Sequence, residues 1–247
     1  MRTCLVIPCF NEETRWSDDY WSALATRPDI NLCFVDDGSS DGTAEIIERL
    51  QTRHDVLLIR LAKNAGKGEA VRIGLNTAMK EGNDIVGFLD ADGAFPVTEV
   101  FRLIAMAEEK IGGYARLDSL WSSRVLLAGR EISRSNGRHY VARMVATLIA
   151  PLHGYKVYDT QSGFKLFANT SELSRCLEDP FLTRWFFDVE ILQRWSNSLG
   201  NRMNVWEEPV QGWRDVRGSK INSSQYLQLM RDLRNLRKGR VNSAILR

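Results

Sequence analysis

The stretch IVGFLDADGAFP, residues 85–96, begins with a short apolar run, which is followed by the two aspartates Asp90 and Asp92. Its first five residues predict a buried strand, and Asp90 and Asp92 follow directly at the end of that strand. Residues two apart in extended backbone point to the same side, so the two carboxylates lie side by side and repel unless a cation lies between them. The same letters also suit a polar turn, because Asp and Gly both favour turns. On its own, the stretch leaves both interpretations open.

On the N-terminal side of this stretch, predicted strands and helices alternate. Continuous apolar runs predict the strands and apolar residues at helical spacing predict the helices, with Asp41 as the N-cap of the second helix. This alternation is typical of a mostly parallel sheet with helices on both faces. The expected strands are 4–10, 30–38, 56–62 and 84–90, and the expected helices are 17–27, 40–53, 66–82 and 96–110.

Polar residues follow each of the four strands. The carboxyl ends of parallel strands meet at one edge of a sheet, and ligands of such sheets bind there. One shared site explains four polar strand ends better than four unrelated turns do. In chain order the residues are Pro8, Asn11, Glu12 and Glu13, then Asp36, Asp37, Gly38 and Ser39, then Lys63, Asn64, Gly66 and Lys67, and last Asp90 and Asp92.

The motifs at this edge argue against two common kinds of nucleotide site. The first strand is not followed by GxGxxG, which disfavours a dinucleotide site. NAGKGEA, residues 64–70, lacks the GxxxxGK[ST] spacing of a phosphate loop. Paired carboxylates instead suit Mg²⁺ or Mn²⁺, which prefer oxygen ligands and are often completed by substrate phosphates. Such a cation would also neutralise charge on a leaving diphosphate.

The composition predicts a globular, cytoplasmic protein. The chain has 247 residues, 44% of them apolar, and a formal net charge of +2, so its charge gives no sign of nucleic-acid binding. The four cysteines form no CxxC pair and are interpreted as buried free thiols in a reducing compartment. No signal peptide is expected, and the longest apolar run, MVATLIAPL (144–152), is too short to span a membrane.

Eight motifs, in order, carry a family resemblance. VIPCFNE, VDDGSSDGT, NAGKGEAVRIGL and FLDADG resemble the motifs of inverting family 2 glycosyltransferases with the GT-A fold. AGR, DTQSGFKLF, RWFFDVEIL and GWRDVRGSK resemble those of the polyprenyl-phosphate sugar transferases within that family, the dolichyl-phosphate β-glucosyltransferases first and the mannosyltransferases next. The resemblance covers about residues 3–235. It implies a GT-A type nucleotide-sugar-binding α/β fold with a mixed, mostly parallel sheet, a catalytic domain over 1–222 and a basic amphipathic helix or tail over 223–247.

The resemblance also implies roles for individual residues. Asp90 and Asp92 match the family's DxD acids, which bind the metal, Mg²⁺ or Mn²⁺, and the diphosphate. Some mannosyltransferase relatives add a glutamine two residues further on as a metal contact, whereas this chain has Ala94 there, as glucosyltransferase relatives tend to. The implied nucleotide-sugar contacts are Pro8, Asn11, Glu12, Asp37, Lys67, Asp90, Asp92, Gln161, Arg214 and Lys220. The implied acceptor contacts are Arg130, Arg143, Ser162 and Lys165, and the implied catalytic residues are Asp92, Arg130, Arg143 and Asp188.

The implied reaction moves glucose or mannose from UDP-glucose or GDP-mannose to a polyprenyl phosphate. A phosphate monoester has its second pKa at about 6 and is mostly dianionic at neutral pH, so it is a competent nucleophile without a strong general base. Positioning, charge stabilisation by the metal and arginine contacts to the phosphate would then supply the catalysis. Attack on an α-linked donor inverts the anomeric carbon and gives a β-linked lipid-phosphate sugar.

Three other functions stay open at this stage. A family 2 enzyme with a sugar-hydroxyl acceptor would use Asp188 or Glu190 as a base. A nucleotidyltransferase is disfavoured by the acidic PCFNEE after the first strand, where such enzymes carry glycines and a basic residue. A non-catalytic nucleotide-sugar-binding module would bind without turnover. The sequence does not decide between the two donors, between the two metals or between oligomeric states.

The predicted tail has two possible contacts. Tyr226, Leu229, Met230, Leu233 and Leu236 recur at helical spacing among basic residues. Such a helix lies on an anionic membrane surface, or it packs on the catalytic domain with its basic side in water. With a lipid acceptor, we expect a peripheral protein on the cytoplasmic membrane face that reaches the bilayer directly or through a membrane-protein partner.

Overall fold

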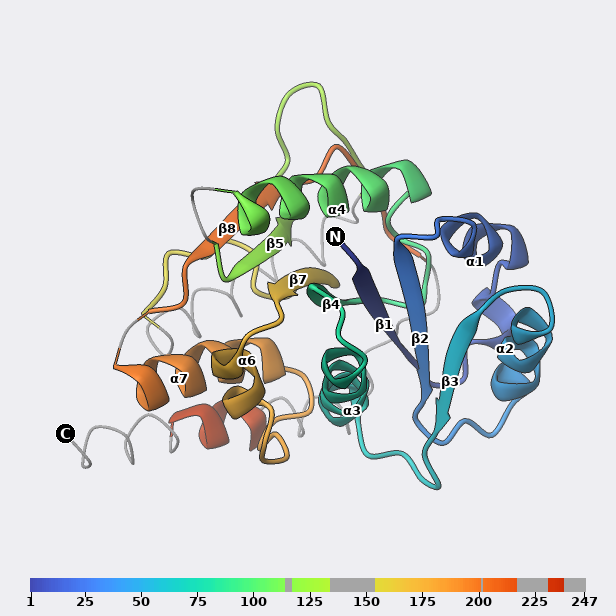
Figure 1. The fold of residues 1–247 in the computed structure, drawn as a ribbon, viewed down its shortest axis with the longest axis horizontal. Coiled ribbons are helices and arrows are strands. Elements are labelled where there is room, and N and C mark those ends of the chain that lie inside the picture. The colour runs from blue at the N-terminus through green and yellow to red at the C-terminus, as the bar shows by residue number, and fades with distance from the viewer. Residues whose placement is uncertain (114–116, 134–153, 201, 217–230, 238–247) are drawn as a thin grey trace.

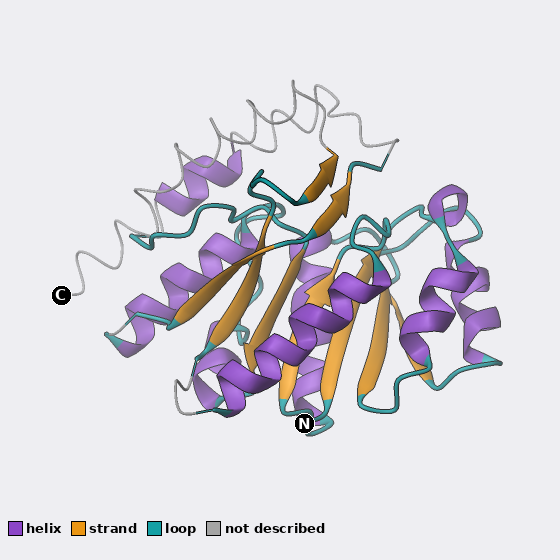
Figure 2. Ribbon diagram, turned by 90° about the horizontal axis from the view of Figure 1, so that it is seen from above, coloured by secondary structure: helices purple, strands orange, loops and turns teal. Residues whose placement is uncertain are grey.

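The computed structural model describes residues 1–113, 117–133, 154–200, 202–216 and 231–237. Within them, a seven-stranded sheet with the order β3-β2-β1-β4-β7-β5-β8 runs through the molecule (Figures 1 and 2). Strand β7 is antiparallel to both of its neighbours, and the other neighbouring strands are parallel. The strands are β1 (Thr3–Cys9), β2 (Ile30–Asp36), β3 (Val56–Arg60), β4 (Ile85–Leu89), β5 (Ser119–Ser123), β7 (Phe164–Ala168) and β8 (Val205–Pro209). A separate parallel pair is formed by β6 (Glu131–Ser133) and β9 (Gly212–Arg214).

Helices cover both faces of the sheet and bury two apolar cores. Alternate residues of β1 face opposite sides, because side chains of a strand alternate. Leu5 and Ile7 pack into the core under α1, α2 and α4, whereas Cys4 and Val6 pack into the core under α3, α6 and α7. The helices are α1 (Asp18–Ala25), α2 (Thr43–Gln51), α3 (Lys67–Lys80), α4 (Val97–Gly112), α6 (Ser171–Cys176) and α7 (Phe187–Leu199), with a short 3₁₀ turn at Glu13–Arg15.

The expected mixed, mostly parallel sheet with helices on both faces is confirmed, and one detail is wrong. Asp41 is not the N-cap of α2, because Gly42 holds that position and its carbonyl accepts the N–H of Ile46 at 3.1 Å. The Asp41 carboxylate instead accepts the backbone N–H of Thr43 at 3.1 Å. Aspartate side chains often bond the backbone two residues further on, which here delays the start of the helix.

All four cysteines are buried and free, as expected. Among the described helices, none has the length and apolar content that crossing a membrane requires.

Part of the predicted tail packs on the domain. Residues 231–237 are helical, and Leu233 and Leu236 contact Phe186 and Val189 at the start of α7. For this segment the structure therefore supports packing on the domain over membrane contact. The rest of residues 223–247 lies outside the described residues.

Candidate active site

The strand ends that carry the predicted site residues meet at one edge of the sheet. The N–H of Asn11 donates to Ser39 Oγ at 3.0 Å, and Asn11 Oδ1 accepts the N–H of Ser40 at 2.9 Å. The N–H of Glu12 donates to Thr43 Oγ1 at 2.8 Å. The segments after β1 and β2 thus form one continuous surface.

Asp37 joins the third strand end to this surface. Its two carboxylate oxygens accept the N–H groups of Ala65 and Gly66 at 2.7 and 2.8 Å. Burial raises the pKa of Asp37, and these two hydrogen bonds oppose the rise. Its predicted contact with the nucleoside stays a prediction, as does that of Pro8, which lies partly buried in β1.

The loop before α3 is held in place from the C-terminal part of the chain. The side chain of Arg184 lies across Gly66, whose φ of +101° suits glycine, and donates to Asn64 Oδ1. The Arg184 carbonyl accepts the N–H of Gly68 at 3.2 Å. Its own N–H donates to the buried Asp232 at 3.0 Å. The described C-terminal segment therefore supports this loop through Arg184.

Asp90 and Asp92 follow β4 as predicted and form the centre of the site. Lys67 Nζ lies 2.5 Å from Asp90 Oδ1, and the N–H of Asp90 donates to the Gly163 carbonyl at 2.9 Å. Burial raises the pKa of Asp92, and the Asp90 charge raises it further. The antiparallel β7 brings Gly163 here, since its first residue lies opposite the last residue of β4. A Cβ at Gly163 would collide with the Asp90 carboxylate.

Glu12 is a third acid in this corner of the site. It is only 8% exposed, and its Oε1 pairs with Arg15 at 2.5 Å while its buried Oε2 has no hydrogen-bond partner among the described residues. Burial raises the pKa of Glu12 to about 7; Arg15 opposes this rise, and the charges of Asp92 and Asp90 add to it. Negative charge is thus concentrated around the end of β4.

The chemistry of this corner fits a divalent cation. Carboxylate oxygens are the ligands that Mg²⁺ and Mn²⁺ prefer, and a cation would relieve the repulsion that raises the pKa of Asp92. No cluster of three or more potential metal-ligating side chains occurs in the described part of the chain. Asp90 and Asp92 would therefore hold the cation together with phosphate or water oxygens, which is how Mg²⁺ is commonly bound.

Arg124, at the end of β5, is a site residue that the sequence did not predict. Its guanidinium pairs with both oxygens of Asp159 at 2.7 and 2.8 Å and lies 5.3 Å from the ring centre of Trp213. Burial alone would lower the pKa of Arg124, but Asp159 first, and then Asp90 and Asp92, raise it. Although burial acts against ionisation of Asp159, Arg124 lowers the pKa of that carboxyl to about 2. No hydrogen bond of Arg124 Nη1 occurs among the described residues, and 13% of the side chain is exposed.

Lys165 is buried inside the domain. Its Nζ donates to the carbonyls of Thr160 and Ser162 at 2.8 and 2.7 Å and to Asp188 Oδ2 at 2.8 Å. Trp121 lies beside the ammonium, with its ring centre 4.7 Å away. Burial lowers the pKa of Lys165, and the Asp188 charge opposes that change. All three N–H groups are used, which favours a positioning role over the acceptor contact that the resemblance implies.

The other predicted residues of the 159–167 motif lie near this pair. Ser162 Oγ is buried and lies 2.5 Å from Ser122 Oγ, so the structure again favours positioning over direct acceptor contact. Gln161 Nε2 lies 3.5 Å from Asp188 Oδ1, a distance that allows only a weak hydrogen bond. Its predicted contact with the donor stays a prediction.

Four basic residues that the resemblance assigns to the site remain, and two of them lie in the described part of the chain. Arg130 directly precedes β6, and Arg214 ends β9, whose partner strand is β6. The N–H of Arg214 donates to the carbonyl of Ala94 at 3.0 Å, which places β9 beside the loop that follows β4. Arg143 and Lys220 lie outside the described residues, so their predicted roles stay predictions.

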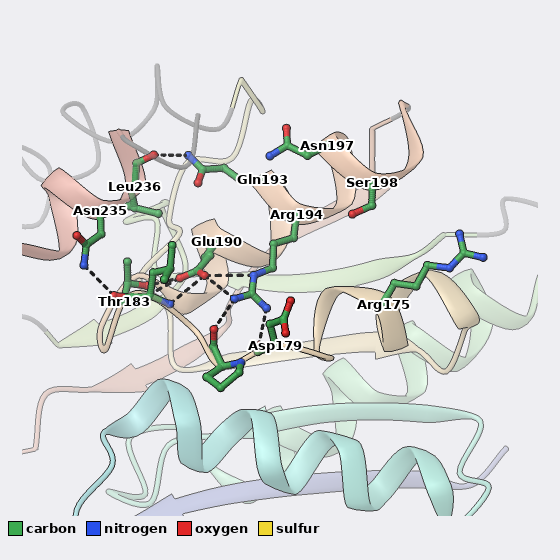
Figure 3. A pocket seen from close by; sticks show the side chains of 12 residues that line it. Arg175, Asp179, Thr183, Glu190, Gln193, Arg194, Asn197, Ser198, Asn235 and Leu236 are labelled. Carbon is green, nitrogen blue, oxygen red and sulfur yellow. Dashed lines mark hydrogen bonds and ion pairs between the residues drawn. The ribbon is translucent and has the colours of Figure 1, made fainter. Parts of the chain in front are cut away.

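Glu190, the alternative base, has a different set of contacts. It binds Arg194 at 2.8 Å and accepts the N–H groups of Leu182 and Thr183 at 3.0 and 3.1 Å (Figure 3). A cavity of about 440 Å³ lies here, lined by residues of the 175–198 region together with Asn235 and Leu236. Glu190 itself lines this cavity, but none of the residues predicted to contact the donor, the acceptor or the metal does. Its contacts therefore place Glu190 in the packing around α7.

The sequence is similar to a named family and to curated proteins. The family model "Glycosyl transferase family 2" matches residues 4–114. A dolichyl-phosphate beta-glucosyltransferase of Trichomonas vaginalis is 33% identical over 249 residues, which cover 94% of this chain and 69% of that protein. A dolichyl-phosphate beta-glucosyltransferase of Homo sapiens is 30% identical, with 93% and 72% covered. A polyprenol monophosphomannose synthase of Mycolicibacterium smegmatis is 23% identical, with 93% and 84% covered.

A solved structure shares the fold. Glucosyl-3-phosphoglycerate synthase of Mycobacterium tuberculosis, crystallised with Mn²⁺, UDP and glucosyl-3-phosphoglycerate, superposes with a TM-score of 0.67. The match covers 97% of this chain and 79% of that protein at 19% sequence identity. The likeness confirms the predicted GT-A type fold.

Proposed function

This chain belongs to glycosyl transferase family 2, and from that premise we propose that it transfers a hexose from a nucleotide sugar to a polyprenyl phosphate. The proposed donors are UDP-glucose and GDP-mannose, and the proposed product is a β-linked lipid-phosphate sugar. The names of the relatives support a prenyl-phosphate acceptor, and the two dolichyl-phosphate beta-glucosyltransferases among them support glucose.

The observation that carries the proposal is the arrangement around the end of β4. Asp90 and Asp92 lie beside Lys67, and the charge of Arg124 interacts with both acids. Acids that hold a cation, next to a lysine, suit a diphosphate that departs with negative charge. When bound, Mg²⁺ or Mn²⁺ would supply the charge that stabilises this leaving group.

The residues of the chain supply positioning and charge. Lys67 can contact a diphosphate bound at Asp90, because its ammonium already lies at that carboxylate. Arg124 is fixed by Asp159, and its Nη1 makes no hydrogen bond among the described residues, so it suits an acceptor phosphate. Arg130 and Arg214 lie at the adjoining β6–β9 pair and are proposed to bind the acceptor and the donor respectively.

A phosphate acceptor agrees better with the surroundings of Asp188 than a sugar hydroxyl does. A hydroxyl acceptor needs a base, yet the Asp188 carboxylate is buried and paired with Lys165. Glu190 is bound to Arg194 and to two backbone N–H groups. A dianionic phosphate attacks without such a base.

The test supplies the purified chain with each donor and each class of acceptor. A short-chain polyprenyl phosphate and a sugar alcohol are incubated with UDP-glucose or GDP-mannose, in Mg²⁺, Mn²⁺ or EDTA, and products are identified by mass spectrometry. We expect a metal-dependent lipid-phosphate sugar from one donor, lost in Asp92→Asn. Product on the hydroxyl alone, or nucleotide binding without any product, would contradict the proposal.

A further inference from the structure

The loop between β5 and β6 exposes two adjacent leucines. Leu126 is 71% exposed and Leu127 is 46% exposed, and Leu126 is the most exposed large apolar side chain of the described residues. Figure 1 shows this loop projecting beyond α4, away from the sheet. Burying two adjacent exposed leucines in an apolar environment would be favourable.

The base of the loop is fixed at the candidate active site on both sides. On the β5 side, Arg124 is held by Asp159. On the β6 side, the N–H of Glu131 donates to the Gln211 carbonyl at 2.8 Å, and β6 pairs with β9. The loop with the two leucines therefore connects the end of β5, at which Arg124 lies, to the β6–β9 pair, at which Arg130 and Arg214 lie.

The dimensions of the loop match a membrane interface. Leu127 is three residues from Arg124, so their Cα atoms are at most roughly 10 Å apart. The headgroup layer on each side of a bilayer is about 6 Å thick. The upper bound of roughly 10 Å allows Arg124 and Arg130 to reach the depth of the lipid phosphates when the leucines lie at the acyl boundary. No ion pair of Arg130 occurs in the described part of the chain, so its positive charge suits anionic headgroups, and the exposed Glu131 next to it reduces the net charge of the loop.

We propose that residues 125–130 dock this chain on an anionic lipid bilayer through Leu126 and Leu127, with the acceptor side of the active site facing the headgroups. The proposal assigns membrane contact to this loop instead of to the leucines of residues 231–237, which pack against α7. It rests on the proposed function for the orientation of the site, whereas bilayer binding itself is tested without turnover.

The first experiment measures binding of the full chain to vesicles of phosphatidylcholine with phosphatidylglycerol, by flotation. Leu126→Ser/Leu127→Ser should bind about thirty-fold more weakly than wild type, about 2 kcal/mol at 1.4 kcal/mol per tenfold. Leu182→Ser is the matched control, because Leu182 is 61% exposed but lies before α7, and it should bind like wild type. Failure of wild type to bind, or equal binding of wild type and the double variant, would overturn the inference.

The second experiment compares two acceptors. With a water-soluble, short-chain polyprenyl phosphate, the double variant should turn over like wild type, because both leucines are exposed on the loop. With long-chain polyprenyl phosphate in vesicles, its rate should fall in proportion to its weaker binding. An equal loss with both acceptors would contradict docking. If wild type uses neither acceptor while the vesicle result holds, the proposed function fails and the docking surface stands.

Discussion

Replacing Glu12 with glutamine should change the pH dependence of stability. The side chain is 8% exposed and burial raises its pKa from 4.5 to about 7. Between these two values the folded protein keeps a proton that the unfolded chain has released. Stability must therefore fall as pH rises through this interval, because it falls wherever the folded state binds more protons.

The size of this effect follows from the shift. Each pKa unit corresponds to about 1.4 kcal/mol, so ionising Glu12 in the folded state costs roughly 3 kcal/mol once the pH is above 7. Below about pH 4.5 both states are protonated and the cost disappears. Glu12→Gln has no proton to lose. The attraction of Arg15 for the ionised carboxylate is already contained in the pKa of about 7, so the slope of wild type includes it.

Urea unfolding followed by tryptophan fluorescence measures the effect. Wild type and Glu12→Gln are compared in metal-free buffer at several pH values between about 4.5 and 8. The free energy of unfolding of wild type should fall by roughly 3 kcal/mol relative to the variant. The control is Glu45→Gln on the exposed side of α2, which should follow wild type. Parallel curves for wild type and Glu12→Gln would refute the reasoning.

Three further changes test the structure around the site. Gly163→Ala should abolish transfer while the far-ultraviolet circular dichroism stays native, because a Cβ collides with Asp90; an active variant would contradict the packing of Gly163 on that acid. Lys165→Met should lower the free energy of unfolding by about 3–5 kcal/mol, since it leaves Asp188 buried without its partner, and Lys165→Met/Asp188→Leu should recover much of that loss in urea titrations. If the double variant is no more stable than the single one, the pair is not the cause. Asp232→Asn should raise the KM for the nucleotide sugar several-fold more than it lowers kcat, because it weakens charge-assisted hydrogen bonds that support the loop before α3. A lower melting temperature with unchanged KM would leave Asp232 a purely structural role.

Local patterns predict the first half of the fold well. Each apolar strand between residues 3 and 89 is followed by a helix, so the alternation in the sequence predicts parallel strands with helical connections. Parallel strands place their carboxyl ends, including Asp90 and Asp92, at one edge of the sheet. In the second half of the chain, motifs indicate site residues, but local patterns do not predict the strands. Strand β5, Ser119–Ser123, is SLWSS, which has too few apolar residues to predict a strand. Arg124 at its end was therefore missed, and its partner Asp159 is far away in sequence.

The position of Lys165 could have been predicted from alternation. In FKLFA, residues 164–168, Lys165 and Phe167 point to one face of the strand, and helices cover both faces of this sheet. A lysine in such a strand must be buried and needs a charged partner, which Asp188 supplies. The antiparallel insertion of β7 between β4 and β5 cannot be read from local pattern, because it depends on long-range pairing.

The most direct test of the central claim is a calorimetric titration of UDP and of GDP into the chain, with Mn²⁺ and with EDTA. We predict that one nucleotide binds about tenfold or more tightly with Mn²⁺ than with EDTA, and that Asp90→Asn and Asp92→Asn each remove this gain. Equal affinity in EDTA, or a gain that both variants keep, would show that the acid pair at the end of β4 does not hold a metal–diphosphate, and would contradict the account.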